Sequence, residues 1–466
     1  MKSKQPNIIY ILADDMGYGD ISYLNKNSKI HTVHFDRLAK EGIAFTDAHS
    51  SSAVCTPSRY SILTGRYNWR SSLKKGVLNG FSAPLIEDGR MTVASLLREQ
   101  GYKTACIGKW HLGMEWAKVG DAESEVDYRE PVQKGPISHG FDYYYGISAS
   151  LDMPPYVYIE NDRVTQLPDR ITRNDDPVAY WREGVTSPDF EHHQVLPKLT
   201  ARTLAWIEMS KEKPFFIYFP LPAPHTPILP SEAFVGQSGT NAYGDFVLMC
   251  DDVIGQIMNK LDELQLSDNT IVIYTSDNGC SPRANYEELA AFKHNPSYVF
   301  RGHKADIYEG GHRIPLIVKW PQRIQAGRMS DEPVCLTDLL ATVAEILEVT
   351  LPPDAGEDSV SNLPVWADLP YERPLREAIV HHSIQGAFSI RQGKWKLELC
   401  PGSGGWSYPK PGEEPEGSPL YQLYDLSKDI GETNNLVDEY PEIVQAMKLV
   451  LERYQESGRS TAVSSK

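Results

Sequence analysis

Several apolar runs in this chain end abruptly at charged or amide residues, and this repeated pattern most restricts the fold. Residues 7–12, 215–219 and 270–275 are continuously apolar rather than alternating, which is typical of strands buried on both faces of a parallel sheet. In an open α/β sheet, ligands bind at the edge formed by the carboxyl ends of the strands. We therefore predict an α/β fold whose functional residues gather at that edge.

Oxygen-bearing side chains follow two of these runs. Asp14 and Asp15 come after the first run, and Asp277 and Asn278 come after 270–275. Adjacent carboxylates at the end of a buried strand are costly unless a cation neutralises them, although a solvated turn is the alternative reading. A donor set made only of oxygens suits Ca²⁺ or Mg²⁺ rather than zinc or copper.

Cationic and titratable side chains stand at comparable places. Lys109 and His111 follow a short strand at 104–107, and we expect them in an extended segment that projects both to one side. His225 is held among alternating prolines just past 215–219. Lys304 precedes a Glu-Gly-Gly turn in which the backbone can approach a neighbour closely. A structural role remains the alternative for each of these residues.

The segment Cys55-Thr56-Pro57-Ser58-Arg59 brings a sulfur and a fixed cation together. Small polar residues precede it, Pro57 suits a first helical turn, and Gly65 can end the helix. Cys55 should therefore lie near a helix N-terminus, which favours anions, with Arg59 on the same face one turn later. A lone buried core cysteine is the alternative.

Bulk composition excludes several classes of protein. The chain has 466 residues and a net charge of -16, which argues against nucleic-acid binding. No apolar run reaches the length of a membrane span. The six cysteines are scattered without a Cys-x-x-Cys pair, so a structural zinc site is not expected. We expect a periplasmic or secreted bacterial protein whose signal peptide is absent from this sequence, with a cytoplasmic location as the alternative.

The C-terminal quarter reads as a smaller unit. Residues 351–369 are rich in Pro, Asp and Ser and resemble a linker. A hairpin is expected around Gln392 and Gly393, and a helix from about 441 to 456. We expect a catalytic domain over 1–370 and a small α+β subdomain over 371–466.

These motifs together resemble the type I sulfatases. The Cys-Thr-Pro-Ser-Arg segment matches that family's Cys-x-Pro-x-Arg signature, and the matches continue in the family's order through Gly108-Lys109-Trp110-His111-Leu112-Gly113 to the Glu-Gly-Gly turn. The resemblance implies an alkaline-phosphatase-like fold, with a large, mostly parallel sheet flanked by helices. It also implies hydrolysis of sulfate monoesters, with Cys55 oxidised to formylglycine by a maturation enzyme.

The resemblance also implies roles for individual residues. One Ca²⁺, or Mg²⁺, would be held by Asp14, Asp15, Cys55 in its modified form, Asp277 and Asn278. The formylglycine hydrate would attack sulfur, and Arg59 would stabilise that hydrate. Sulfate oxygens would be neutralised by Lys109, His225 and Lys304, the last two also being candidate donors to the leaving oxygen. His111 would take the proton that allows sulfate to leave.

The chain resembles the glycosaminoglycan-type carbohydrate sulfatases, including the N-acetylgalactosamine-6-sulfatase type, more than the short aryl-sulfate enzymes. A sulfated galactose or N-acetylgalactosamine is therefore the expected substrate. The candidate sugar contacts are Trp69, Arg70, Asn295, Tyr298, Arg301, His303, His312, His381 and His382. Two alternatives stay open: a phosphate or phosphonate monoester hydrolase on the same scaffold, and a glycan-binding protein in which Cys55 is unmodified.

Overall fold

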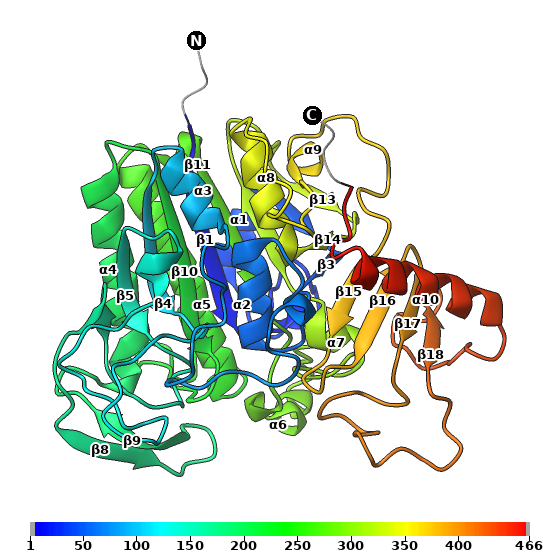
Figure 1. Ribbon diagram of the computed structural model, residues 1–466, viewed down its shortest axis with the longest axis horizontal. Helices are drawn as coiled ribbons and strands as arrows, with labels where there is room; N and C mark the ends of the chain where they lie inside the picture. Colours follow the sequence, from blue (N-terminus) through cyan, green and yellow to red (C-terminus); the bar gives the residue numbers. More distant parts are fainter. Residues whose placement is uncertain (1–4, 463–466) are drawn as a thin grey trace.

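A ten-stranded sheet flanked by helices forms the centre of the computed structural model, which describes residues 5–462 (Figure 1). The strand order is β13-β2-β12-β11-β1-β10-β4-β5-β6-β7. The five strands from β11 to β5 are parallel, whereas β12 and β6 are antiparallel to both of their neighbours. The strands are β1 (Asn7–Asp14), β2 (Ile43–Phe45), β4 (Lys103–Lys109), β5 (Tyr143–Ile147), β6 (Ile159–Glu160), β7 (Arg163–Val164), β10 (Phe215–Pro224), β11 (Thr270–Ser276), β12 (Leu316–Lys319) and β13 (Arg328–Ser330).

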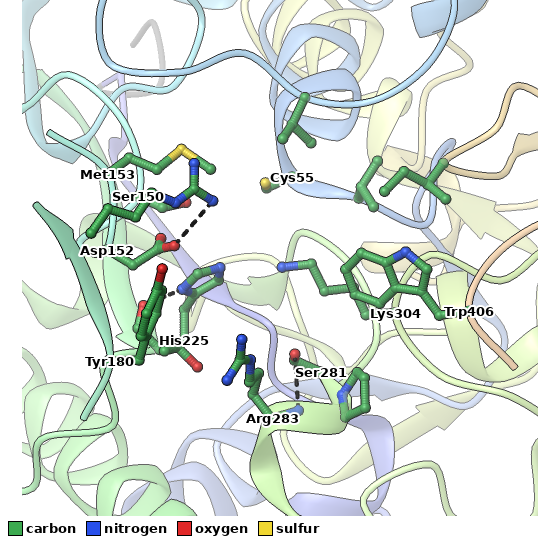
Figure 2. Close-up of a pocket in the computed structure, with 16 residues that line it drawn as sticks. Cys55, Ser150, Asp152, Met153, Tyr180, His225, Ser281, Arg283, Lys304 and Trp406 are labelled. Atoms are coloured by element: carbon green, nitrogen blue, oxygen red, sulfur yellow. Dashed lines mark hydrogen bonds and ion pairs between the residues drawn. The ribbon is translucent and has the colours of Figure 1, made fainter. Parts of the chain in front are cut away.

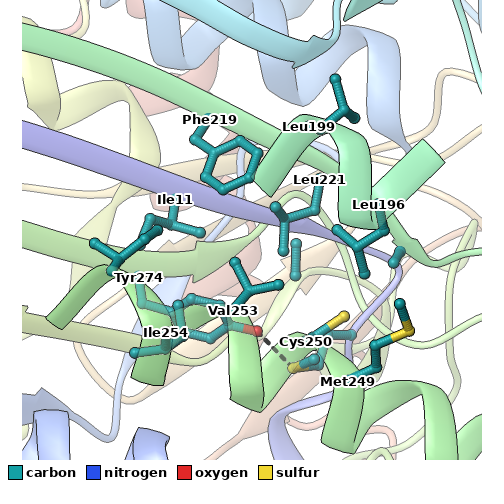
Figure 3. Packing of buried hydrophobic residues seen from close by; sticks show 14 of the residues in the cluster. Ile11, Leu196, Leu199, Phe219, Leu221, Met249, Cys250, Val253, Ile254 and Tyr274 are labelled. Atoms are coloured by element: carbon teal, nitrogen blue, oxygen red, sulfur yellow. Dashed lines mark hydrogen bonds between the residues drawn. The ribbon is translucent and has the colours of Figure 1, made fainter. Parts of the chain in front are cut away.

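Strand β1 shows why the central runs are apolar without alternation. Its Ile9 and Ile11 pack into one hydrophobic core, and Ile8 and Tyr10 pack into a second core on the opposite face. Figure 3 shows the first core, where α4 and α5 cover the sheet. The helices that contribute to the first core are α1 (Val33–Lys40), α4 (Val195–Ser210), α5 (Ala242–Glu263) and, through Leu289, α6 (Tyr286–Ala291). Those that contribute to the second are α2 (Cys55–Thr64), α3 (Val93–Glu99), α8 (Leu339–Ile346) and α9 (Leu363–Trp366).

The helix predicted around the cysteine motif is confirmed. Helix α2 begins at Cys55, and Gly65 ends it in the left-handed conformation with φ of 65°. Only glycine adopts that conformation without strain. All ten residues of α2 are buried, so the helix lies inside the molecule and its N-terminus faces an internal site.

A second, four-stranded antiparallel sheet stands beside the main one (Figure 1). Its strands, in order, are β15 (Ile379–His382), β16 (Phe388–Gln392), β17 (Trp395–Glu398) and β18 (Gln422–Asp425). The predicted hairpin at Gln392 and Gly393 is confirmed by the β16–β17 pairing, and α10 (Pro441–Glu456) packs against this sheet. The fold class is therefore as expected, while the domain limits 1–370 and 371–466 stay a prediction.

The expected linker at 351–369 is wrong. This segment contains α9, whose Leu363, Val365 and Trp366 belong to the second core. Asp358 is fully buried and accepts two hydrogen bonds from Arg70, at 2.8 and 2.9 Å. This segment, rich in proline and aspartate, therefore packs against the second core and is not a solvent-exposed linker.

The remaining elements are short. They are β3 (Ala48–His49), β14 (Val334–Cys335), β8 (Arg170–Asn174), β9 (Trp181–Thr186), α7 (Glu309–His312), η1 (Tyr18–Asp20), η2 (Asn68–Arg70), η3 (Pro136–His139), η4 (His192–Gln194), η5 (Ser267–Asn269), η6 (Pro282–Ala284) and η7 (Leu336–Asp338). Across residues 5–462, no helix is both long and apolar enough to cross a bilayer.

Candidate active site

Four elements converge at one edge of the main sheet. Strands β1, β4 and β11 end there in parallel, and α2 begins there. The resulting site lies at the bottom of a cavity of about 580 Å³, whose wall includes Cys55, His225 and Lys304. Figure 2 shows the Lys304 amine, the His225 ring and the Cys55 sulfur directed toward one another.

The four oxygen-bearing residues predicted at the strand ends do come together. Asp15 N–H donates to Asp277 Oδ1 at 3.2 Å, and Asn278 Nδ2 donates to Asp15 Oδ1 at 2.7 Å. Asp14 lies in the same cluster, linked through Lys109 and Arg59. All four side chains are buried. The parallel sheet thus joins residues more than 260 positions apart in the chain.

This donor set fits a hard cation. Asp14 Oδ1 and Asn278 Oδ1 are buried and have no hydrogen-bond partner within the described chain. Asp14, Asp15 and His225 each offer a ligand atom, and these atoms lie within 4.8 Å of one another. Buried oxygens without donors are costly, and a bound Ca²⁺ or Mg²⁺ would satisfy them with the ligand type it prefers.

Three buried cations neutralise the carboxylates. Arg59 donates twice to Asp277 Oδ2, at 2.7 and 3.1 Å, and Lys109 Nζ donates to Asp14 Oδ2 at 2.6 Å. Lys304 Nζ donates to Asp15 Oδ2 at 2.7 Å. Burial alone raises the pKa of the Asp14 carboxyl, but Lys109 and the other nearby cations hold it well below its usual range. The Asp14 carboxyl therefore stays ionised, as a cation ligand must. Burial instead raises the pKa of Asp277 to about 6, although Arg59 opposes the shift.

Cys55 is poorly suited to act as a thiolate. Its side chain is 2% exposed, and burial raises the pKa of its thiol, although Lys109 and Lys304 oppose the shift. Reactive cysteines instead show a lowered pKa. The position of Cys55 at the helix N-terminus is confirmed, but its sulfur as it stands is not an activated nucleophile.

His111 lies at the site in a conformation that differs from the prediction. The chain leaves the β conformation after Lys109, and His111 has φ of 57°. Expecting one extended segment over Lys109 and His111 was therefore wrong. The His111 Nε2–H donates to the Leu78 carbonyl at 2.7 Å, so Nδ1 is the lone-pair nitrogen, and it has no partner within the described residues. Burial and Lys109 lower the pKa of His111 well below its usual value, which keeps the ring a neutral proton acceptor.

The cavity has a polar wall opposite Lys304. Ser150, Asp152 and Thr226 line it, and each is at least nine-tenths buried. Ser150 Oγ, Asp152 Oδ1 and Thr226 Oγ1 lack a hydrogen-bond partner within the described chain. Asp152 Oδ2 lies 3.4 Å from Arg182. Hydroxyl or amide groups of a bound molecule can pair with such atoms.

Sequence reasoning missed this wall, together with Tyr180, Arg283 and Trp406, which also line the cavity. One signal was available: Ser148–Asp152 follows β5, so the rule that strand ends carry function applied there too. No sequence pattern near Trp406 indicated that it would line the cavity. Trp406 lies in the β17–β18 connection of the small sheet, which is distant in sequence from most of the other lining residues.

None of the nine predicted sugar contacts lines this cavity. His312 and His381 are fully buried and stack at 3.7 Å, so they present no surface to a saccharide, and predicting sugar contacts there was wrong. Trp69, Arg70 and His382 line a separate groove with Phe388.

The other four residues brace loops. Arg301 donates to the Glu432 carbonyl at 2.7 Å, and His303 is hydrogen-bonded to Ser407 at 3.1 Å. Asn295 donates to the Tyr298 carbonyl within one turn. The Tyr298 ring packs against the rings of Tyr18 and Phe300. The predicted sugar contacts at these four positions are therefore engaged with other parts of the protein.

Comparison with known proteins gives one consistent result. Residues 6–349 match the family model described as Sulfatase. The chain is 35% identical to an N-acetylgalactosamine-6-O-sulfatase of Bacteroides thetaiotaomicron, covering 97% of this chain and 93% of that protein. It is 28% identical to the N-acetylgalactosamine-6-sulfatase of Homo sapiens, with 97% and 86% covered, and 32% identical to the human steryl-sulfatase, with 78% and 70% covered.

Solved structures agree with these relatives. A structure described with the metabolism of multiple glycosaminoglycans by Bacteroides thetaiotaomicron has a TM-score of 0.87 at 34% identity, covering 97% of this chain and 100% of that one. A structure in complex with a neocarrahexaose has a TM-score of 0.73 at 22% identity, covering 99% and 94%. The second likeness supports the fold alone.

Proposed function

Since this chain belongs to the sulfatase family and is a sulfuric ester hydrolase, we propose that its substrate is a 6-O-sulfated N-acetylgalactosamine or galactose in a glycan. The relative at 35% identity over 97% of the chain is named for that ester. The observation that carries the saccharide part is the polar wall, where Ser150, Asp152 and Thr226 present buried atoms without partners. A sugar ring supplies several hydroxyls that can pair with such atoms.

The proposal assigns one Ca²⁺ to Asp14, Asp15, Asp277, Asn278 and residue 55 in its converted form. Mg²⁺ is the alternative ion. When bound, the cation would polarise a sulfate oxygen. The formylglycine that a maturation enzyme would make from Cys55 supplies, as its hydrate, the oxygen nucleophile. The raised pKa of the unmodified thiol supports this assignment, because a thiolate is disfavoured there.

The remaining side chains bind the sulfate and move protons. Lys109, Lys304 and His225 are placed to balance negative charge that develops on the sulfate oxygens. His225 or Lys304 donates a proton to the leaving sugar oxygen. Arg59 is fixed by Asp277 and the Lys109 carbonyl and orients residue 55. His111 Nδ1, free to accept, takes a proton from residue 55.

The test is a matched set of sulfated sugars presented to enzyme whose residue 55 is shown by mass spectrometry to be converted. Sulfate release should be fastest from 6-O-sulfated N-acetylgalactosamine or galactose, and slower from the 4-O-sulfated and gluco counterparts. Asp152→Asn should reduce kcat/KM for the sugar by roughly tenfold to a hundredfold, because an acceptor for substrate hydroxyls is lost.

Two results would contradict the proposal. Faster sulfate release from the 4-O-sulfated sugar would show that the preferred substrate carries its sulfate at O4 rather than at O6. Faster turnover of an aryl phosphate than of the matched aryl sulfate would favour the phosphate monoester hydrolase instead. Because sulfated glycans lie outside the bacterial cell, the proposal includes a periplasmic or secreted location, which fractionation of the native host tests.

A further inference from the structure

Three histidines from separate elements meet where the small sheet packs on the rest of the molecule. His49 ends β3, His312 ends α7 and His381 lies on β15 (Figure 1). Each offers one ring nitrogen, and the three nitrogens lie within 4.8 Å of one another. All three side chains are fully buried, and none lines the active-site cavity. The proposed reaction uses none of them.

The outer nitrogen of His49 is held by a carboxylate. His49 Nε2–H donates to Asp47 Oδ1 at 2.7 Å. Arg391 lies 3.0 Å from the same nitrogen, but its guanidinium donates to both oxygens of Asp47. Burial alone raises the pKa of the Asp47 carboxyl, but Arg313 and Arg391 hold it well below its usual range, so Asp47 is an ionised acceptor. A neutral ring with its proton on Nε2 presents its lone pair at Nδ1.

The outer nitrogen of His312 is held by a backbone carbonyl. His312 Nε2–H donates to the Ile307 carbonyl at 3.1 Å. Lys396 Nζ also lies 3.1 Å from this nitrogen, but the ammonium has better acceptors in the Ile307 carbonyl at 2.9 Å and Glu432 Oε1 at 2.6 Å. His312 therefore also presents its lone pair at Nδ1.

The inner nitrogens of the cluster need a cation. His49 Nδ1 and His312 Nδ1 are 3.0 Å apart, where two lone pairs repel unless a proton or a metal ion lies between them. His381 adds a third nitrogen. Its Nδ1 is hydrogen-bonded to Ser389 Oγ at 3.0 Å, and its Nε2 has no partner within residues 5–462. A buried nitrogen without a partner is costly.

The three rings are in the protonation state that binds metals. Burial lowers the pKa of His49 and holds the pKa of His312 and of His381 well below the usual value. Neutral imidazole is a ligand of Zn²⁺. A carboxylate, a carbonyl and a hydroxyl on the outer nitrogens are the partners that orient such ligands in metal sites.

We propose that His49, His312 and His381 form a second metal site, which takes Zn²⁺ and which we call the histidine site. Three nitrogen donors suit zinc, whereas the oxygen donors of the active site suit Ca²⁺. A water completes the coordination. The rings of His312 and His381 stack at 3.7 Å with 13° between their planes, so one of them turns when zinc binds.

The position of the histidine site indicates a structural role. The Ser50 N–H donates to the His312 carbonyl at 2.8 Å, and the Ala53 N–H donates to the His382 carbonyl at 3.0 Å. The segment that leads into Cys55 therefore already rests on α7 and β15. A metal ion shared by β3, α7 and β15 would fasten the small sheet to this segment.

The experiment measures zinc binding to the full chain without any substrate. Protein stripped of metal is supplied with excess Ca²⁺, which occupies the oxygen site, and is then titrated with Zn²⁺ against a competing chromogenic chelator. Wild type should bind one more Zn²⁺ per chain than His381→Phe, which keeps an aromatic ring against His312 but offers no ligand. Ser389→Ala removes only an outer partner and should weaken zinc binding by roughly tenfold to a hundredfold.

A matched control is available at His31, whose side chain is exposed. His31→Asn removes an imidazole from the surface and should leave both the zinc stoichiometry and the affinity unchanged. Equal stoichiometry in wild type and His381→Phe would overturn the inference.

A measurement on wild type alone covers the case in which His381→Phe does not fold. X-ray absorption at the zinc edge should show nitrogen neighbours at about 2.0–2.1 Å with the outer-ring scattering of imidazole. Sulfur neighbours would place the ion at a cysteine, and oxygen neighbours alone would place it among the carboxylates. Either result would reject the histidine site. Since no step of this test uses a sulfated sugar, its outcome is independent of the proposed function.

Discussion

Arg59 connects the sulfur, the carboxylates and the cations of the site. It is fully buried, donates twice to Asp277 Oδ2 and once to the Lys109 carbonyl, and lies one helical turn after Cys55. A buried arginine is tolerated because every contact compensates its charge. The helix therefore sets the spacing of Cys55 and Arg59, and hydrogen bonds to residues at the strand ends hold Arg59 in place.

Residue 55 itself is open to a direct test. Cys55→Ala and Cys55→Ser should each lower sulfate release by roughly 10⁴-fold or more, because the nucleophile is removed while the surrounding charges remain. Circular dichroism and the melting temperature should stay close to those of wild type, since both replacements are smaller than or equal in size to cysteine. Near-normal turnover by either variant would refute the assigned mechanism.

Strands β4 and β10 approach each other closely beside the site. Gly108 lies near the end of β4 with φ of 141°, and a Cβ there would be 2.0 Å from the Pro220 carbonyl oxygen. Since Lys109 follows directly, this contact sets how far Lys109 stands from β1. The close backbone approach therefore determines the position of a charged group.

The variant Gly108→Ala should lose at least about 3 kcal/mol of stability through overlap and strain. Gly101→Ala is the control: its φ is 87°, but nothing lies within 4 Å of an added Cβ, so it should cost only about 1–2 kcal/mol. Urea unfolding of both variants provides the comparison. Equal losses would show that overlap with Pro220 is not important.

Helices α1 and α5 are joined by a carboxylate whose ionisation is unfavourable. Asp251, on α5, accepts the N–H groups of His34 and Phe35 at the start of α1. Burial nevertheless raises the pKa of Asp251 to about 7 from 3.8. The folded state therefore binds a proton between about pH 4 and pH 7 that the unfolded state does not bind, and stability falls as the pH rises through that range.

The variant Asp251→Asn should remove this dependence of the free energy of unfolding on pH. Between pH 5 and pH 7 the free energy of unfolding of wild type should fall relative to that of the variant by on the order of 2 kcal/mol. Parallel denaturant titrations across pH 5 to 8 measure the difference. A difference that stays constant over this range would show that Asp251 is ionised throughout.

At the scale of the whole molecule, many buried charges from distant segments meet at one site. Three carboxylates and three cations are buried at the ends of β1, β4 and β11 and the start of α2. Asp14 Oδ1 and Asn278 Oδ1 there have no hydrogen-bond partner among residues 5–462. The small sheet contributes to the same region through the loop pinned on Asp306. Occupation of the site should therefore stabilise the entire fold.

Removal of Ca²⁺ tests this expectation. Calcium at a hundredfold excess over its Kd should stabilise wild type by about 2.7 kcal/mol, and a chelator should lower the melting temperature by several degrees. Asp14→Asn should show a much smaller calcium effect, because Asp14 Oδ1 accepts no hydrogen bond from the part of the chain that the structure describes. Scanning calorimetry measures both proteins. A wild type stripped of metal, as shown by elemental analysis, that melts unchanged would contradict the cation assignment.

Much of the core of the site was predictable from the sequence. Asp14, Asp15, Lys109, Asp277 and Asn278 all follow apolar runs, and parallel strands necessarily end at one edge of their sheet. The α/β class, the start of α2 at its cysteine and the hairpin of the small sheet follow from similarly local patterns. Those features depend on neighbours in the chain or on a general rule of sheet topology.

The sequence by itself therefore determined which residues stand at the sheet edge and what charge they bring there. Only the tertiary structure decided the left-handed backbone at His111 and the polar wall at Asp152. It also decided the hydrogen bond from the Trp406 N–H to Asp306, which lies 100 positions away in the chain. The physical reason is that side-chain surroundings depend on contacts between distant segments. His312 and His381 were candidate ligand contacts from the sequence, yet packing of α7 against β15 removes both side chains from solvent.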